Sequence, residues 1–103
     1  MIIFNTTFLV PDNIFDEWKL WISADYLPFM LRTGGFSEPQ LARILNENPE
    51  PEKAYSVQLR IENHDSLQTW QKKSEAEIHE ICLKKFSSKV LFFSTALEVI
   101  DHK

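Results

Sequence analysis

Apolar residues alternate with polar ones in several stretches of this chain, and between those stretches they recur at every third or fourth position. The first alternating stretch runs from Ile2 to Val10 and stops at Pro11, which has no amide hydrogen with which to extend a central strand. A clearer alternation runs from Ala54 to Ile61. The stretch from Phe36 to Asn46 is less regular and contains Pro39, so it predicts an edge strand.

The last alternating stretch, Lys89 to Ile100, is apolar on both sides of the strand that it predicts. Because successive side chains of a strand point to opposite faces, its apolar residues divide into two sets. One set is Val90, Phe92 and Ala96, and the other is Leu91, Phe93, Leu97 and Val99. A sheet that contains this strand therefore needs an apolar layer on each of its faces.

The spacing after the first strand predicts a helix from Ile14 to Leu31. We expect Asp12 or Asn13 to cap its first amides, and Pro28 to kink or break it around Tyr26 and Leu27. The pair Gly34 and Gly35 then ends it, since glycine adopts the left-handed conformation that closes helices. The apolar stripe of this helix is Phe15, Trp18, Trp21, Ile22 and Phe29.

A second helix is predicted to begin after a cap at Asn63 or Asp65. The residues from Gln71 to Glu77 are almost entirely polar, so the pattern leaves open whether this helix continues through them or is broken near Ser74. Ser74 with Glu77 three residues later matches a capping box, at which a new helix could start. Its inward residues would be Ile78, Ile81, Cys82 and Phe86.

The predicted order of strand, helix, strand, strand, helix, strand is that of a ferredoxin-like α+β sandwich over residues 1–103, as a single domain. Right-handed crossovers put the first and third strands at the centre of a four-stranded antiparallel sheet. Two helices cover one face, so the other face needs a partner. We predict a homodimer, with interface candidates Leu91, Phe92, Phe93 and Leu97.

Composition narrows the range of partners. Fifteen acidic and eleven basic residues give a formal net charge of −4, which disfavours nucleic acid because phosphate backbones are bound by clustered Lys and Arg. No apolar run reaches the ~20 residues of a membrane-spanning helix. The chain has one cysteine and therefore no intrachain disulfide. We expect a cytoplasmic protein that does not bind membranes.

The potential metal ligands are scattered. A structural zinc site normally takes four ligands at recognisable spacing, and only His79 and Cys82 lie close together in the sequence, with His64 and His102 distant. The glycines at 34 and 35 form no phosphate-binding loop. We therefore expect neither a metal nor a cofactor.

A few polar and aromatic residues are candidates for a small-molecule pocket between the first helix and the sheet. Asn5 and Tyr55 can fix a ligand by hydrogen bonds, Arg43 can join them, and Trp21 can supply an apolar wall. The competing interpretation is structural, because Trp18 and Trp21 also suit core packing, and isolated polar residues on strands usually meet backbone or solvent.

An RNA-recognition domain uses the same fold and stacks bases on its open sheet. Lys53 to Arg60 stands where its longer motif would be, but Ala54 replaces the glycine, and Val57 and Arg60 replace aromatic residues. This motif therefore gives little support for RNA binding.

Six segments of the chain carry a family resemblance: Met1–Thr7, Trp18–Trp21, Leu27–Pro28, Thr33–Phe36, Tyr55–Gln58 and Ala96–Val99. Together they resemble an uncharacterised family of short bacterial proteins, catalogued as a domain of unknown function. The resemblance covers nearly the whole chain and implies the dimeric α/β barrel superfamily, in which two ferredoxin-like sheets face each other. Relatives in that superfamily include cofactor-free monooxygenases, isomerases, haem-binding enzymes and stress-response proteins, so the resemblance implies a fold and selects no activity. Tyr26 stands where the family is expected to have a histidine.

We expect a homodimeric barrel protein that binds a small ligand or has a structural role. The alternative is a cofactor-independent, monooxygenase-like enzyme that uses the predicted pocket. A third possibility, an RNA-binding module, conflicts with the dimer, because one sheet face cannot be both buried against a copy and open to RNA.

Overall fold

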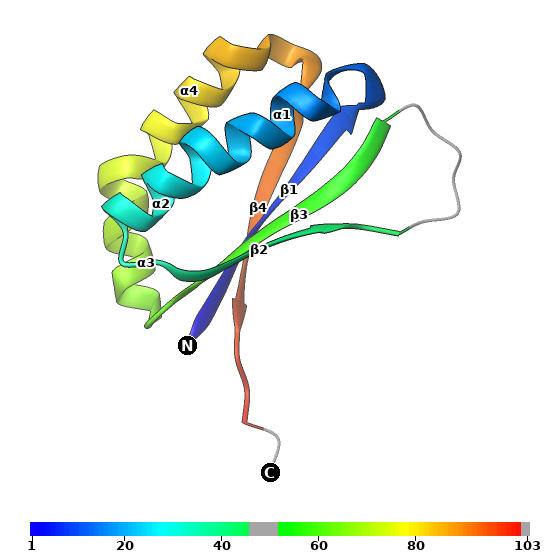
Figure 1. Cartoon of the computed structure of the whole chain (residues 1–103). Helices are drawn as coiled ribbons and strands as arrows, with labels where there is room; N and C mark the ends of the chain where they lie inside the picture. Colours follow the sequence, from blue (N-terminus) through cyan, green and yellow to red (C-terminus); the bar gives the residue numbers. More distant parts are fainter. Residues whose placement is uncertain (46–51, 102–103) are drawn as a thin grey trace.

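The computed structural model describes residues 1–45 and 52–101. Its strands form one antiparallel sheet, and the described helices all lie against one face of that sheet (Figure 1). The strands are β1 (Ile2–Pro11), β2 (Ser37–Arg43), β3 (Glu52–Ile61) and β4 (Leu91–Glu98). Their order, β2-β3-β1-β4, confirms the ferredoxin-like α+β prediction with the first and third strands at the centre.

Each helical crossover consists of α-helices joined by a wider π-helical turn. The first contains a 3-10 turn (Asp12–Ile14), α1 (Phe15–Trp21), a π-helical turn (Ile22–Tyr26) and α2 (Leu27–Thr33). The second contains α3 (His64–Trp70), a π-helical turn (Gln71–Glu75), α4 (Ala76–Phe86) and a 3-10 turn (Ser87–Lys89).

Aromatic rings dominate the core between these helices and the sheet. The ring of Phe8 on β1 lies 5.4 Å from Trp18, 6.4 Å from Trp21 and 5.6 Å from Tyr26, measured between centroids. Such pairs contribute about 0.5–1.5 kcal/mol each beyond the area that they bury. The predicted helix stripe is confirmed, because Trp18, Trp21, Ile22 and Phe29 are buried and Phe15 is half-buried against the same core.

The first helix differs from its prediction at its start and in its middle. Neither Asp12 nor Asn13 caps it, because the chain enters through a 3-10 turn and Asp12 instead accepts a hydrogen bond from Lys53 Nζ at 2.8 Å. In place of a break before Pro28, the helix widens, and the Leu27 amide donates to the Ile22 carbonyl. The predicted end is confirmed, with Gly35 at a φ of 66°.

The second helix is continuous through Ser74, a point that its sequence pattern left open. Asn63 caps it as predicted, since its Oδ1 accepts a hydrogen bond from the Ser66 amide at 2.8 Å. No side-chain cap forms at the capping-box sequence, because Glu75 already has a helical backbone there. The polar run from Gln71 to Glu75 is the π-helical turn.

The strand β2 lies at the sheet edge, as its proline predicted. Its register with β3 shifts between Ser37 and Gln40, on either side of Pro39, and Glu38 has a φ of 52°. This irregularity is typical of an edge that needs no second partner. The segment Asn48–Glu52, in which prolines at 49 and 51 predict a loop, lies outside the described residues except for Glu52, where β3 begins.

The sheet face away from the helices, here called the open face, carries the second apolar set of the last strand. Leu91, Phe93 and Leu97 are 55%, 59% and 44% exposed. They stand opposite Leu9, Thr7 and Ile3 of β1 in the antiparallel register. The prediction that this strand is apolar on both sides is therefore confirmed. The interface candidate Phe92 is a correction, because it points toward the helices and packs against the core and therefore does not lie on the open face with Leu91, Phe93 and Leu97. Alternation adds to the open face Asn5 of β1 and Ser56, Gln58 and Arg60 of β3.

Candidate functional site

The structure does not bring together the four residues that the sequence suggested for a ligand pocket. Trp21 and Tyr55 are buried on the helix side of the sheet. Asn5 lies on the open face, because it alternates with the inward-facing Phe4 on β1. Arg43 is exposed near the end of the edge strand, in register with Tyr55. The predicted convergence was wrong because Asn5 and Tyr55 take opposite faces of the sheet, and alternation along one strand does not show how its faces align with those of another strand.

The contacts of Asn5 and Tyr55 indicate structural roles. Asn5 Oδ1 accepts a hydrogen bond from Ser56 Oγ, and its Nδ2 donates to Thr7 Oγ1 at 3.2 Å. Tyr55 stacks on Phe15 with ring centroids 4.9 Å apart. The amide of Asn5 is therefore used within the open face, and the ring of Tyr55 belongs to the aromatic core.

Trp21 does line a pocket, between the helices and the strands β1 and β4. We call it the inner pocket. It encloses about 10 Å³, which is room for about one water molecule. Aromatic rings form most of its wall, and its polar side chains are Thr6, Tyr26, His79, Cys82 and Ser94.

Three of these polar side chains form a hydrogen-bonded series, here called the hydroxyl row. Tyr26 donates to Thr6 Oγ1 at 3.3 Å, and Thr6 Oγ1 lies 2.9 Å from Ser94 Oγ. Burial raises the pKa of Tyr26 to about 12, so its phenol stays protonated at physiological pH. The row therefore has a permanent donor at its buried end.

A larger hollow, the edge groove, opens beside the inner pocket along β4. It has a volume of about 290 Å³. The groove and the inner pocket share Phe4, His79, Phe92 and Ser94. The rings of His79 and Phe92 lie 4.9 Å apart between centroids and belong to the wall common to both hollows. The other residues of the groove are Gln71, Glu75, Phe93 and Ala96.

Sequence reasoning missed the hydroxyl row. A signal for it existed, because Thr6 and Ser94 are polar residues at positions where alternation points the side chain toward the helices. Their pairing, however, joins strands 88 residues apart in the chain.

Cys82 of the inner pocket is chemically quiet. It is 3% exposed, and burial raises its pKa to about 11, so it remains a thiol at physiological pH. Among residues 1–45 and 52–101, no group of three or more His, Cys, Asp or Glu side chains is placed to hold a metal ion. The inner pocket therefore offers hydrogen-bonding groups and apolar walls more readily than a nucleophile.

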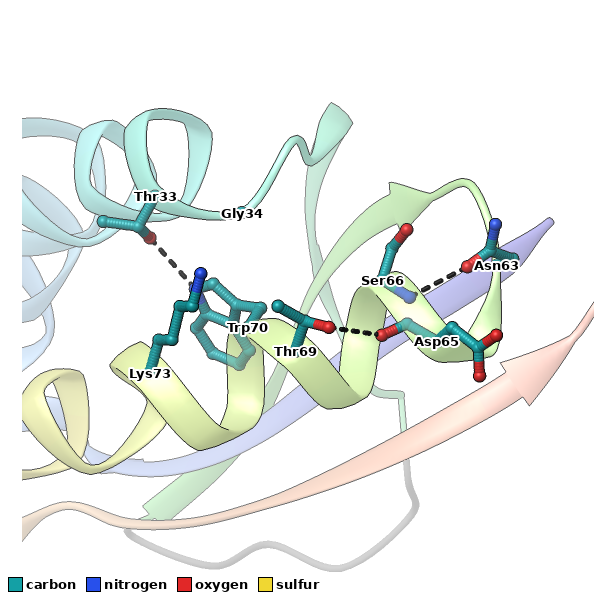
Figure 2. Close-up of a pocket in the computed structure, with 8 residues that line it drawn as sticks. All are labelled: Thr33, Gly34, Asn63, Asp65, Ser66, Thr69, Trp70 and Lys73. Carbon is teal, nitrogen blue, oxygen red and sulfur yellow. Dashed lines mark hydrogen bonds between the residues drawn. The ribbon is translucent and has the colours of Figure 1, made fainter.

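A polar cleft of about 420 Å³ lies where α2 ends and α3 begins (Figure 2). Trp70 Nε1 donates to Thr33 Oγ1 at 3.0 Å, and Thr33 in turn donates to the Phe29 carbonyl at 2.8 Å. Asn63 accepts the Ser66 amide on the same side. Because these groups already bond to one another, we assign the cleft a structural role, in which it holds the ends of two helices together.

None of the helices in the described part of the chain is long and apolar enough to cross a membrane.

Three solved structures share this fold across almost their whole length. An EthD (ethyl tert-butyl ether) family protein from Bacillus halodurans matches with a TM-score of 0.67 at 15% identity, over 97% of this chain and 100% of that one. HapK from Hahella chejuensis matches with a TM-score of 0.68 at 12% identity, over 100% and 96%. SnoaB, a cofactor-independent oxygenase from Streptomyces nogalater, matches with a TM-score of 0.62 at 13% identity, over 98% and 95%.

These identities are low enough that the likeness concerns the fold alone, which is that of the dimeric α/β barrel proteins. The chain has no match among curated proteins. A family model described as a domain of unknown function, DUF4286, matches residues 1–100. The chain therefore belongs to the DUF4286 family, in agreement with the resemblance seen in its sequence.

Proposed function

We propose that this protein is a homodimer whose two sheets pack open face to open face, and that each subunit binds a small apolar molecule in its edge groove. The main observation in support of the dimer is the row of large apolar side chains on a sheet face that no described helix covers. Leu91, Phe93 and Leu97 are each between 44% and 59% exposed. Contiguous apolar surface of this kind is characteristic of protein interfaces.

The polar groups of the open face support burial against a second copy. Asn5, Thr7 and Ser56 hydrogen-bond to one another, so covering them leaves no side-chain amide without a partner. Arg60 pairs with Glu38 at 3.2 Å, which reduces the cost of placing its charge near an interface. When the open face is desolvated, these groups therefore keep their partners within the subunit.

The dimer is tested by sedimentation across a wide range of protein concentration, in physiological salt. We expect a mass near twice the 12.1 kDa of the chain. Phe93→Glu should weaken the dimer by about 30-fold or more, the effect of losing a buried aromatic at an interface centre. The matched control is Leu20→Glu, because Leu20 is 67% exposed on α1, on the helix side of the molecule.

A wild-type monomer at every concentration would overturn the dimer. The open face would then be available to another partner, and binding of single-stranded RNA at low salt would be the next measurement. Binding that weakens steeply with salt would support the RNA module instead.

The ligand part of the proposal is tested by protein-observed NMR with a library of small apolar fragments. We expect shifts to concentrate at Gln71, His79 and Ser94, which line the edge groove. Ala96→Trp should fill the groove and abolish these shifts, whereas Ala76→Trp, at an exposed position of α4, should not. Shifts unaffected by Ala96→Trp would show that the fragments bind elsewhere.

A second candidate is a cofactor-independent small-molecule enzyme, for which the supporting observations are the likeness to SnoaB and the place of His79 in the wall shared by the inner pocket and the edge groove. His79 is the group in the shared wall best suited to proton transfer. The test is oxygen uptake with candidate substrates in metal-free, flavin-free buffer. Turnover that is lost in His79→Gln and kept in His64→Gln, a change at an exposed residue, would support the enzyme. Equal loss in both variants would count against this site.

A further inference from the structure

The hydroxyl row connects the buried core to the edge groove. Tyr26 and Thr6 are 4% and 3% exposed, whereas Ser94 is exposed and lines the groove. The row therefore begins in the buried core and ends where a ligand would lie.

Burial sets the direction in which the three hydroxyl protons point. Tyr26 donates to Thr6, so the Thr6 hydroxyl oxygen already accepts a hydrogen bond from the core. If Thr6 donates to Ser94, the proton of Ser94 is left over at an exposed position, where solvent or a ligand can accept it. If Ser94 donated instead, the buried proton of Thr6 would need another acceptor, and leaving it without one is unfavourable. The outward direction is therefore preferred.

We propose that Ser94 presents this outward-pointing proton to the carbonyl oxygen of a neutral ligand in the edge groove. This inference rests on the small-ligand site proposed above and names the chemistry that the site recognises. Phe4, Phe92 and Ala96 would contact the apolar body of the ligand while its oxygen accepts from Ser94. The series of hydrogen bonds behind Ser94 strengthens its hydroxyl as a donor, because bonded hydroxyls polarise one another.

The charge in the groove favours a ketone, ester or amide over a carboxylic acid. Glu75 lines the groove, and a ligand carboxylate would be repelled by it. His79 and Gln71 are the other polar side chains in contact with this space. A neutral acceptor satisfies Ser94 without placing a second negative charge beside Glu75.

The test compares three probes of similar size, acetophenone, ethylbenzene and benzoate, by NMR titration of the full chain. For the wild type, we expect acetophenone to bind about fivefold more tightly than ethylbenzene, the effect of one added hydrogen bond, and benzoate to bind most weakly. Ser94→Ala should remove the preference for acetophenone while leaving the affinity for ethylbenzene unchanged. Ser94→Thr retains a hydroxyl and should therefore keep the preference for acetophenone.

Thr95→Ala is the matched control, because Thr95 lies next to Ser94 in the chain but faces the opposite side of the sheet, in register with Asn5. Equal affinity for acetophenone and ethylbenzene, or a preference that survives Ser94→Ala, would overturn the role of Ser94 while leaving the groove as a ligand site. If neither aromatic probe shifts the groove residues, the proposed ligand site itself fails, and this inference fails with it.

Discussion

At the scale of single residues, Gly34 is required by close packing. A Cβ atom at this position would lie 2.4 Å from Phe36 Cε2 and 2.7 Å from Trp70 Cδ1. Gly35 is different, since its surroundings are open and its positive φ is the reason for glycine there. Glycine therefore stands at these two neighbouring positions for different physical reasons.

We expect Gly34→Ala to lower the free energy of unfolding by about 1–3 kcal/mol, the usual cost of overpacking. Gly35→Asn should cost about 1 kcal/mol or less, because asparagine tolerates a positive φ. Urea unfolding of both variants measures the difference. A Gly34→Ala variant as stable as Gly35→Asn would mean that the rings of Phe36 and Trp70 move aside freely.

The buried Cys82 thiol makes stability depend on alkaline pH. Its pKa rises from 9.0 to about 11 in the folded protein, so between these values the unfolded chain has lost the proton that the folded protein still holds. The free energy of unfolding is therefore unaffected below pH 9 and falls as pH rises toward 11. Tyr26 adds a similar fall from pH 10, since burial raises its pKa from 10.0 to about 12.

We therefore expect the stability of Cys82→Ala to begin its alkaline decline about one pH unit higher than that of the wild type. The variant will be less stable at neutral pH because it loses core volume, so the comparison concerns the slope between pH 9 and 10 and not the absolute value. Urea unfolding at half-unit pH steps measures it. Parallel slopes in the two proteins would contradict a raised thiol pKa.

At the scale of elements, the two crossovers share a structural feature, a π-helical turn, that their sequences do not reveal. Each has a buried tryptophan, Trp21 or Trp70, directly before a π-helical turn. In a regular α-helix Trp70 and Ile78, eight positions apart, would differ by about 80° around the axis. A π-helical turn contains about one residue more than an α-helical turn, which brings Trp70 and Ile78 back to the same side of the helix. Both side chains therefore face the sheet.

Deleting one exposed residue from the wide turn should therefore be tolerated. We expect a variant lacking Lys72 to fold with a regular helix and to lose less than about 1 kcal/mol of stability. The matched control lacks Glu80, an exposed residue of α4, and rotates Cys82 and Phe86 away from Ile78. It should lose more than about 3 kcal/mol, as when large core side chains are removed. Urea unfolding compares them, and equal losses would contradict this account of the wide turn.

At the scale of the whole molecule, stability should depend on protein concentration if the open faces pair. Dimerisation stabilises the folded state by mass action, so the wild-type Tm should rise by a few degrees for each tenfold increase in concentration. Phe93→Glu should remove most of this dependence, and Leu20→Glu should preserve it. Calorimetry across a hundredfold range of concentration measures the effect. A wild-type Tm independent of concentration would contradict the dimer.

Most of the fold could be predicted because its signals are local. The alternation of Ile2 to Val10 and of Ala54 to Ile61, the helical spacing from Ile14, and the glycines after Thr33 each reflect the nearest few residues. Strand order then follows from the handedness of the crossovers. Local signals were insufficient where tertiary packing overrides local chemistry, as at Ser74, where a capping sequence lies within a continuous helix.

The candidate site was the less predictable part. Of Asn5, Trp21, Arg43 and Tyr55, the inner pocket contains Trp21 alone. The sequence could indicate that Thr6 and Ser94 point inward, because alternation is a property of one strand. It could not indicate that Tyr26, from a helix, reaches Thr6 to complete the hydroxyl row.

The sequence by itself therefore determined the strands, the crossovers and the apolar open face, since these follow from periodicity along a single element. Only the tertiary structure decided the π-helical turns, the hydroxyl row and the edge groove. Each of these depends on side chains from different elements meeting at distances of a few ångströms, and the register of strands and helices that sets those distances is a property of the packed molecule.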